Sequence, residues 1–206
     1  MKVIYVWDAL CGWCYGFGTV LEAFVARHPE LELELVSGGL IPTEMLTVKA
    51  HPYIPEANQR ITNTYGVRFG SAYEQAIRGK GLRVSSFHTA WAFGLLRKQL
   101  PKAQHLALAK AMQTAMYAEG RSLSELDTYR PILREFGLSE TLLLPELGKA
   151  LRKDDTMHPD FSRARELEAE VYPTLLLEHQ GELYLLSEGA ALAEEVELRY
   201  QQIIAD

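Results

Sequence analysis

The chain has 206 residues, of which 48% are hydrophobic and 23% charged, and its formal net charge is −6. These values are ordinary for a soluble globular protein and fit one large domain, or one domain that carries an insertion. The negative charge, without a basic stripe of interleaved aromatic residues, argues against nucleic acid as a partner. No apolar run approaches the roughly 18 residues of a membrane span, so we expect no membrane partner either.

The N-terminus leads directly into a predicted strand. Met1 and Lys2 precede the apolar run Val-Ile-Tyr-Val at residues 3–6, which is typical of a buried strand. No apolar secretion segment with a small-residue cleavage site comes before it. We therefore expect the protein to stay in the cytoplasm, where a closely spaced cysteine pair is more often catalytic or redox-sensing than structural.

Two cysteines follow this strand, and they are the only cysteines in the chain. Cys11 falls at the expected N-terminus of a helix, where unpaired N–H groups and the helix dipole stabilise a thiolate relative to the thiol. Cys14 lies one turn later on the same face, within reach of a mixed disulfide formed at Cys11. The pair therefore predicts a redox site that cycles between dithiol and disulfide.

Three other roles compete for the cysteine pair. A structural disulfide around about four residues would contribute only about 2 kcal/mol, which a chain of this length does not need. Two unrelated buried cysteines would leave their strand-to-helix position unexplained. A zinc site would need a second pair of ligands at suitable spacing, and we expect neither a metal nor another cofactor. The histidines are scattered singly, at His28, His51, His88, His105, His158 and His179.

The next segments complete a strand–helix–strand unit. Residues 19–26 have apolar positions at helical spacing, and the sequence His28-Pro29 ends that pattern. Residues 31–36 alternate apolar and charged, which indicates a second strand with one buried face. Glycines at 38 and 39 break it. The crossover predicts two parallel strands in a right-handed βαβ unit.

From about residue 43 to residue 170 the pattern is almost entirely helical. We expect these helices to form an insertion that packs a core of its own. Ser85 or Ser86, Ser124, Ser139 and Asp160 are candidate N-caps. The predicted helices cover residues 55–65, 71–78, 86–96, 101–116, 126–136, 139–151 and 160–167.

Strand character returns near the C-terminus. Residues 174–178 and 183–186 are apolar runs separated by a turn at 179–182, which predicts a β-hairpin. An acidic amphipathic helix over residues 190–204 ends the chain.

Taken together, the chain resembles the DsbA-like branch of the thioredoxin superfamily, in particular its cytoplasmic FrnE-like and disulfide-isomerase-related group. The resemblance rests on Asp-Ala-Leu-Cys-Gly-Trp-Cys-Tyr-Gly-Phe at residues 8–17, on Gly-Gly-Leu at 38–40 and on Tyr-Pro-Thr at 172–174. It implies an α/β fold, in which a thioredoxin-like domain (βαβ plus ββα) at residues 1–45 and 170–206 is interrupted by an all-α helical insertion domain at 46–169.

The resemblance also implies an activity and roles for the motif residues. Cys11 would attack the substrate disulfide, and Cys14 would then resolve the mixed disulfide. Gly12 and Trp13 would set the redox poise of the cysteine pair. Trp13 could also form part of an apolar rim that receives substrate. Substrates would be protein or peptide thiols and disulfides, or glutathione, and a redox partner would recycle the enzyme.

Four further residues are candidates with weaker or alternative roles. The resemblance implies a cis bond between Tyr172 and Pro173, which would leave the Tyr172 backbone free to pair with substrate. The alternative is that Pro173 only begins a strand and has no role in substrate binding. Asp8 either caps the first helix or assists proton transfer at Cys14. His88 could face the cysteines, although a lone helical histidine is usually a packing residue.

Two functional alternatives stay open at this stage. One is a glutathione-dependent isomerase or transferase of the kappa-type group, whose members generally carry Ser at the position of Cys11 and lack the second cysteine. The other is a peptide-binding or chaperone module that uses the disulfide only as a switch.

Overall fold

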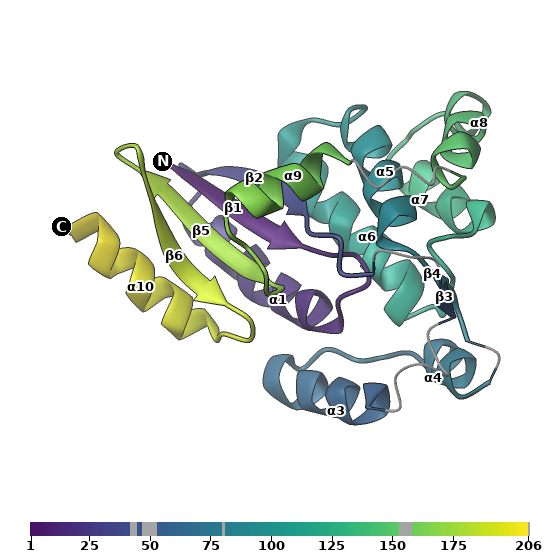
Figure 1. Cartoon of the computed structure of the whole chain (residues 1–206), viewed down its shortest axis with the longest axis horizontal. Helices are drawn as coiled ribbons and strands as arrows, with labels where there is room; N and C mark the ends of the chain where they lie inside the picture. Colours follow the sequence, from purple (N-terminus) through teal and green to yellow (C-terminus); the bar gives the residue numbers. More distant parts are fainter. Residues whose placement is uncertain (42–44, 47–52, 80, 153–157, 206) are drawn as a thin grey trace.

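A four-stranded sheet forms the centre of the computed structural model, which describes residues 1–41, 45–46, 53–79, 81–152 and 158–205. The order across the sheet is β2-β1-β5-β6 (Figure 1). β1 and β2 are parallel, whereas β5 is antiparallel to both of its neighbours. The predicted βαβ unit and C-terminal hairpin are therefore confirmed. The strands are β1 (Lys2–Trp7), β2 (Glu32–Ser37), β5 (Thr174–His179) and β6 (Glu182–Glu188).

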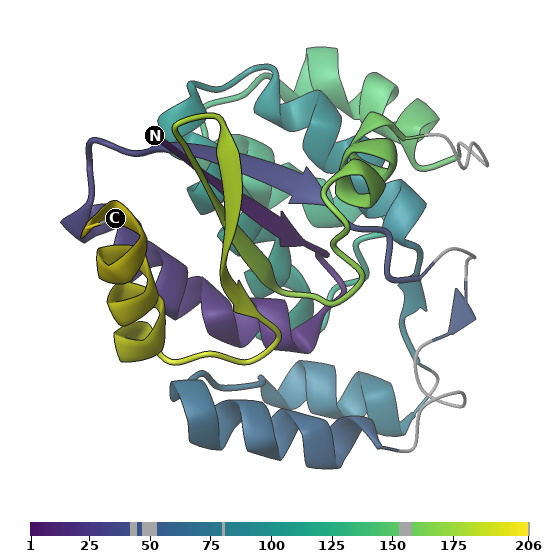
Figure 2. The same ribbon diagram turned by 60° about the vertical axis from the view of Figure 1, so that its left-hand side comes forward.

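Helices cover both faces of the sheet (Figure 2). α1 (Gly12–Arg27) and α10 (Ala193–Ala205) lie on one face, and α9 (Pro159–Glu166) lies on the other. Side chains along a strand alternate between the two faces. Val3, Tyr5 and Trp7 of β1 accordingly join the core on the α1 side, and the residues between them pack towards α9.

The helical part of the chain lies mostly beyond one end of the sheet (Figure 1). Its helices match most of the predicted ones, although the segment after Pro101 starts as a 3₁₀ helix, η1 (Lys102–Gln104), before α6 begins. A second 3₁₀ helix, η2 (Leu126–Thr128), precedes α7. The α-helices are α3 (Ile54–Tyr65), α4 (Ser71–Arg78), α5 (Ser86–Arg97), α6 (His105–Tyr117), α7 (Tyr129–Glu135) and α8 (Glu140–Ala150).

Two of the predicted caps are confirmed and two are wrong. Ser85 and Ser139 each accept a backbone hydrogen bond at the start of α5 and α8. Ser124 caps no helix, because its hydroxyl lies 3.1 Å from Nδ1 of His88. Asp160 lies inside α9, where the Nδ1 atom of His158 accepts the capping bond from the Asp160 N–H.

One short ladder departs from the all-α insertion that the resemblance implies. β3 (Met45–Leu46) and β4 (Arg83–Val84) form a short antiparallel ladder. Each of these strands has two residues, which is too few for an alternating pattern to be recognised in the sequence.

The described helices do not pack a core separate from the sheet. Trp7, at the end of β1, meets Phe93 of α5 edge to face, with ring centroids 5.2 Å apart. Both belong to one continuous cluster of buried residues that also contains Tyr5, Met112 and Leu147. The expectation of an independent helical core is therefore wrong, because the large side chain of Trp7, at the end of β1, packs among the helices. Among the described residues, no helix is long and apolar enough to cross a membrane.

Candidate active site

The first turn of α1 positions the two cysteines. Cys11 is the N-cap of the helix, with an extended backbone, and its own N–H donates to the carbonyl of Asp8 at 3.1 Å. The Sγ atom of Cys11 accepts the backbone N–H of Cys14 at 3.2 Å. Sulfur thus occupies the place of the usual capping oxygen, and a negative charge on it would be favoured by the N–H and by the helix dipole.

Cys11 also faces the segment that precedes β5. Its thiol donates to the carbonyl oxygen of Tyr172 at 3.6 Å, although the two residues are 161 positions apart. The Tyr172–Pro173 peptide bond is cis, and Pro173 is buried. The Tyr172 hydroxyl donates to the Gly38 carbonyl at 2.7 Å, and burial raises the pKa of this phenol to about 12. Tyr172 therefore connects the loop after β2 to Cys11.

Cys14 lies deeper than Cys11. It has no exposed surface, and both cysteines are free thiols. Burial raises the pKa of the Cys14 thiol well above its ordinary value, and its interaction with Cys11 adds to this shift. Of the two cysteines, only Cys11 lines the cavity that opens beside the first turn of α1. An external disulfide would therefore contact Cys11 first.

Asp8 does not cap α1, since Cys11 holds that position. One carboxylate oxygen of Asp8 accepts the N–H of Leu10 at 2.9 Å. The other accepts the N–H groups of Gly39 and Leu40 at 3.0 and 2.9 Å. Burial raises the pKa of this carboxyl, and the three backbone donors oppose that rise. Asp8 thus ties the loop before Cys11 to the loop after β2.

A cavity of about 400 Å³ opens beside Cys11. Its walls are mostly apolar and come from the first turn of α1, the loop after β2, α3 and the helical layer. Trp13 packs edge to face on Tyr65, and the guanidinium of Arg60 lies 5.7 Å from the centre of the Trp13 ring. The lining residues are Leu10, Cys11, Gly12, Trp13, Leu40, Ile41, Tyr53, Ile54, Ala57, Asn58, Ile61, Tyr73, Val84, Met116, Tyr117 and Tyr172.

Gly12 lines the cavity and lies close to α3. A Cβ atom at this position would lie 3.1 Å from Cδ1 of Ile61, so a larger residue would press against α3. Because Gly12 has no side chain, α3 can lie close to the helix turn that carries Cys11 and Cys14. The sequence pattern did not single out the cavity residues of α3, because their apolar spacing is that of any amphipathic helix.

His88 lies elsewhere. It is buried, its Nδ1 atom lies 3.1 Å from the Ser124 hydroxyl, and it is not part of the cavity wall. Within the described ranges no three His, Cys, Asp or Glu side chains gather as metal ligands could, and His51 lies outside those ranges.

No protein-family model and no curated protein sequence matches the chain. Several solved structures do. A candidate protein disulfide isomerase from Nitrosomonas europaea is 18% identical, with a TM-score of 0.81, over 99% of this chain and 97% of that one. The cytosolic disulfide reductase DsbM from Pseudomonas aeruginosa is 25% identical, with a TM-score of 0.79, over 100% of both chains. The chain has the DsbA-like thioredoxin fold.

Two further structures share this DsbA-like fold. DsbM has also been solved with GSH, and that structure is 26% identical, with a TM-score of 0.73, over 100% of this chain and 98% of that one. A candidate DsbA oxidoreductase from Streptomyces coelicolor is 19% identical, with a TM-score of 0.72, over 100% of this chain and 91% of that one. These likenesses support a thiol–disulfide oxidoreductase in general terms.

Proposed function

We propose that the protein reduces disulfides by dithiol–disulfide exchange, with Cys11 as the attacking thiolate and Cys14 as the resolving thiol. The observation that carries this assignment is the unequal environment of the two sulfur atoms. Cys11 is 5% exposed, lines a cavity and accepts an N–H from the helix terminus, whereas Cys14 is 0% exposed and does not line that cavity. A nucleophile needs access and a stabilised thiolate, and a resolving group needs only to reach the mixed disulfide.

The reaction has two exchanges. The Cys11 thiolate attacks one sulfur of a substrate disulfide, the substrate S–S bond breaks, and the departing thiolate takes a proton from solvent. Cys14 then loses its proton and attacks the Cys11 sulfur, which releases the second substrate thiol and leaves a Cys11–Cys14 disulfide. The substrate gains two electrons and two protons, and an external dithiol or two glutathione molecules restore the enzyme.

The surroundings of Cys11 favour a small or extended substrate. The cavity is mostly apolar, and Trp13 in its wall has the Arg60 guanidinium over its ring. The carbonyl of Tyr172 faces the sulfur and can accept a hydrogen bond from the backbone of an extended peptide or of glutathione. The similar Pseudomonas protein has been solved with GSH, and it is described as cytosolic. We propose glutathione-containing disulfides as substrates and the cytoplasm as the compartment.

Trapping the mixed disulfide tests this function. Cys14→Ser cannot resolve, so after incubation with oxidised glutathione it should carry one glutathione at Cys11, detected by intact mass. Cys11→Ser should remain unmodified under the same conditions, because Cys14 is buried. Equal modification of the two variants would contradict the assigned roles. A Cys11→Ser variant that still turned over a disulfide substrate would contradict the function itself.

A further inference from the structure

A second cavity lies beside the one that opens at Cys11. It has a volume of about 300 Å³, and its walls come from α3, α4 and the segment that joins them. Asn58 of α3 lines both cavities. Oδ1 of Asn58 and Cζ of Phe69, both from the wall of the second cavity, lie 3.9 and 4.0 Å from the place of a Cβ atom on Gly12. One wall of the second cavity is therefore next to the helix turn that carries the cysteines.

Two arginines line this second cavity. Among the described residues, no carboxylate pairs with the guanidinium of Arg68. Arg78 pairs with Glu74 one turn earlier in α4, but the closest atoms are 3.7 Å apart and the side chains are 73% and 48% exposed. An exposed pair of this kind contributes little energy, so Arg78 can still bind another carboxylate.

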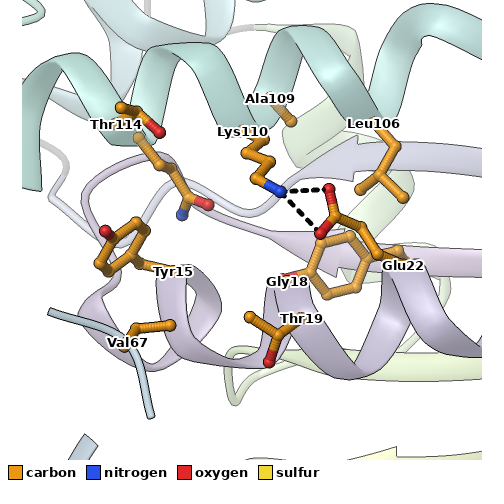
Figure 3. Close-up of a pocket in the computed structure, with 11 residues that line it drawn as sticks. Tyr15, Gly18, Thr19, Glu22, Val67, Leu106, Ala109, Lys110 and Thr114 are labelled. Carbon is orange, nitrogen blue, oxygen red and sulfur yellow. Dashed lines mark hydrogen bonds and ion pairs between the residues drawn. The ribbon is translucent and has the colours of Figure 1, made fainter. Parts of the chain in front are cut away.

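Two other cavities hold their lysines and arginines in ion pairs. Between α1 and α6, Lys110 donates to both carboxylate oxygens of Glu22 at 2.8 Å, in the wall of a cavity of about 110 Å³ (Figure 3). Along β2, a cavity of about 330 Å³ is lined by lysines and arginines that each pair with a carboxylate, namely Lys2, Arg97, Lys102 and Arg163. Within the described ranges, the cavity between α3 and α4 differs from both because one of its cations is unpaired.

The charge of this region also differs from that of the whole chain. The chain has a net charge of −6, whereas residues 53–79, which include α3 and α4, contain three arginines and two glutamates. An acidic protein repels an anionic substrate unless a local positive region offsets that field. A guanidinium is suited to this task, because it binds a carboxylate through two parallel N–H donors.

We propose that the cavity between α3 and α4 binds a carboxylate of a small anionic disulfide while the disulfide lies at Cys11, with Arg68 and Arg78 as the groups that bind it. The substrate class is a disulfide whose flanking groups carry carboxylates, of which oxidised glutathione is an example. An extended tripeptide spans roughly 10 Å, so its parts can occupy two cavities that share Asn58 in their walls. This inference rests on the proposed function and defines the substrate class within it.

The experiment compares an anionic disulfide with a neutral one. Reduced protein is mixed with excess oxidised glutathione or with hydroxyethyl disulfide, quenched in acid at successive times and alkylated, and the Cys11–Cys14 disulfide is counted by mass. The double variant Arg68→Gln, Arg78→Gln should react roughly fivefold more slowly with oxidised glutathione at low ionic strength, because charge-assisted hydrogen bonds are lost. Its rate with hydroxyethyl disulfide should equal that of the wild type. The difference should shrink as salt is added.

The double variant Arg165→Gln, Arg199→Gln is the matched control, because it removes the same charge from α9 and α10. The Arg165 guanidinium donates to the Ser162 hydroxyl, and that of Arg199 donates to the Leu185 carbonyl. Neither arginine lines either of the two cavities. Both rates of this variant should stay within about twofold of the wild-type rates, since distant exposed charges are largely screened.

The outcomes separate this inference from the proposed function. A wild-type rate with oxidised glutathione in Arg68→Gln, Arg78→Gln would overturn the carboxylate site. Equal slowing with both disulfides would overturn it too, and so would the same selective slowing in the control variant, which would indicate an effect of net charge. A wild-type protein that forms no Cys11–Cys14 disulfide with either reagent would instead contradict the proposed function.

Discussion

At the scale of single residues, the site depends on backbone groups that buried side chains hold in place. Asp8 is the clearest case, because its two oxygens satisfy N–H groups from two different loops. A carboxylate is an acceptor at both oxygens, which an amide is not. The charge of Asp8 is costly to bury, yet the three donors require it.

Asp8→Asn should therefore destabilise the fold. The amide nitrogen would face either the N–H of Leu10 or those of Gly39 and Leu40, leaving at least one buried donor without an acceptor. We expect a loss of about 1–3 kcal/mol in the free energy of unfolding, measured by urea denaturation. Asp127→Asn, at a highly exposed carboxylate, should change it by less than about 0.5 kcal/mol. Equal stability of both variants would show that Asp8 does not hold the two loops together.

At the scale of elements, α1 and α3 lie in close contact, and residues of both helices line the cavity beside Cys11. Gly16 of α1 makes this contact possible. A Cβ atom on Gly16 would lie 2.3 Å from the ring of Tyr65 and 2.8 Å from Cγ2 of Ile61, both on α3. Gly18, on the same helix, has nothing within 4 Å of the equivalent position.

These two glycines predict opposite effects of the same substitution. Gly16→Ala should displace α3 and cost about 1–3 kcal/mol of stability through overpacking. Gly18→Ala should stabilise α1 by about 0.5–1 kcal/mol, because alanine is the better helix former. Chemical denaturation of the two variants side by side measures both effects. A stabilising Gly16→Ala would contradict the packing of α3 on α1.

The elements also show what the sequence could and could not predict. Periodicity and local caps located most helices, and Ser85 and Ser139 cap as expected because the capping bond spans only three residues. The predicted cap at Asp160 is wrong because the Asp160 carboxylate accepts the N–H of Ser37 at 3.0 Å and bonds Arg97 at 2.6 Å, partners distant in the sequence. The predicted cap at Ser124 is wrong for the same reason, since its partner His88 is 36 positions away.

At the scale of the whole molecule, the sheet brings distant segments to one site. Cys11 follows β1 and Tyr172 precedes β5, and the antiparallel pairing of β1 with β5 sets these ends side by side. Composition and periodicity alone could locate the cysteine turn but not its partner strand. The resemblance, and not the periodicity, indicated Tyr172, whose carbonyl faces Cys11.

The redox equilibrium of the Cys11–Cys14 pair tests the central claim most directly. The protein is equilibrated in glutathione buffers of increasing oxidation, quenched in acid and alkylated, and its free thiols are counted by mass. We predict a single transition in which both thiols disappear together as an intramolecular disulfide. Thiols that remain free in fully oxidised buffer, or a stable glutathione adduct on Cys11 beside a free Cys14, would contradict the assignment of Cys14 as the resolving cysteine.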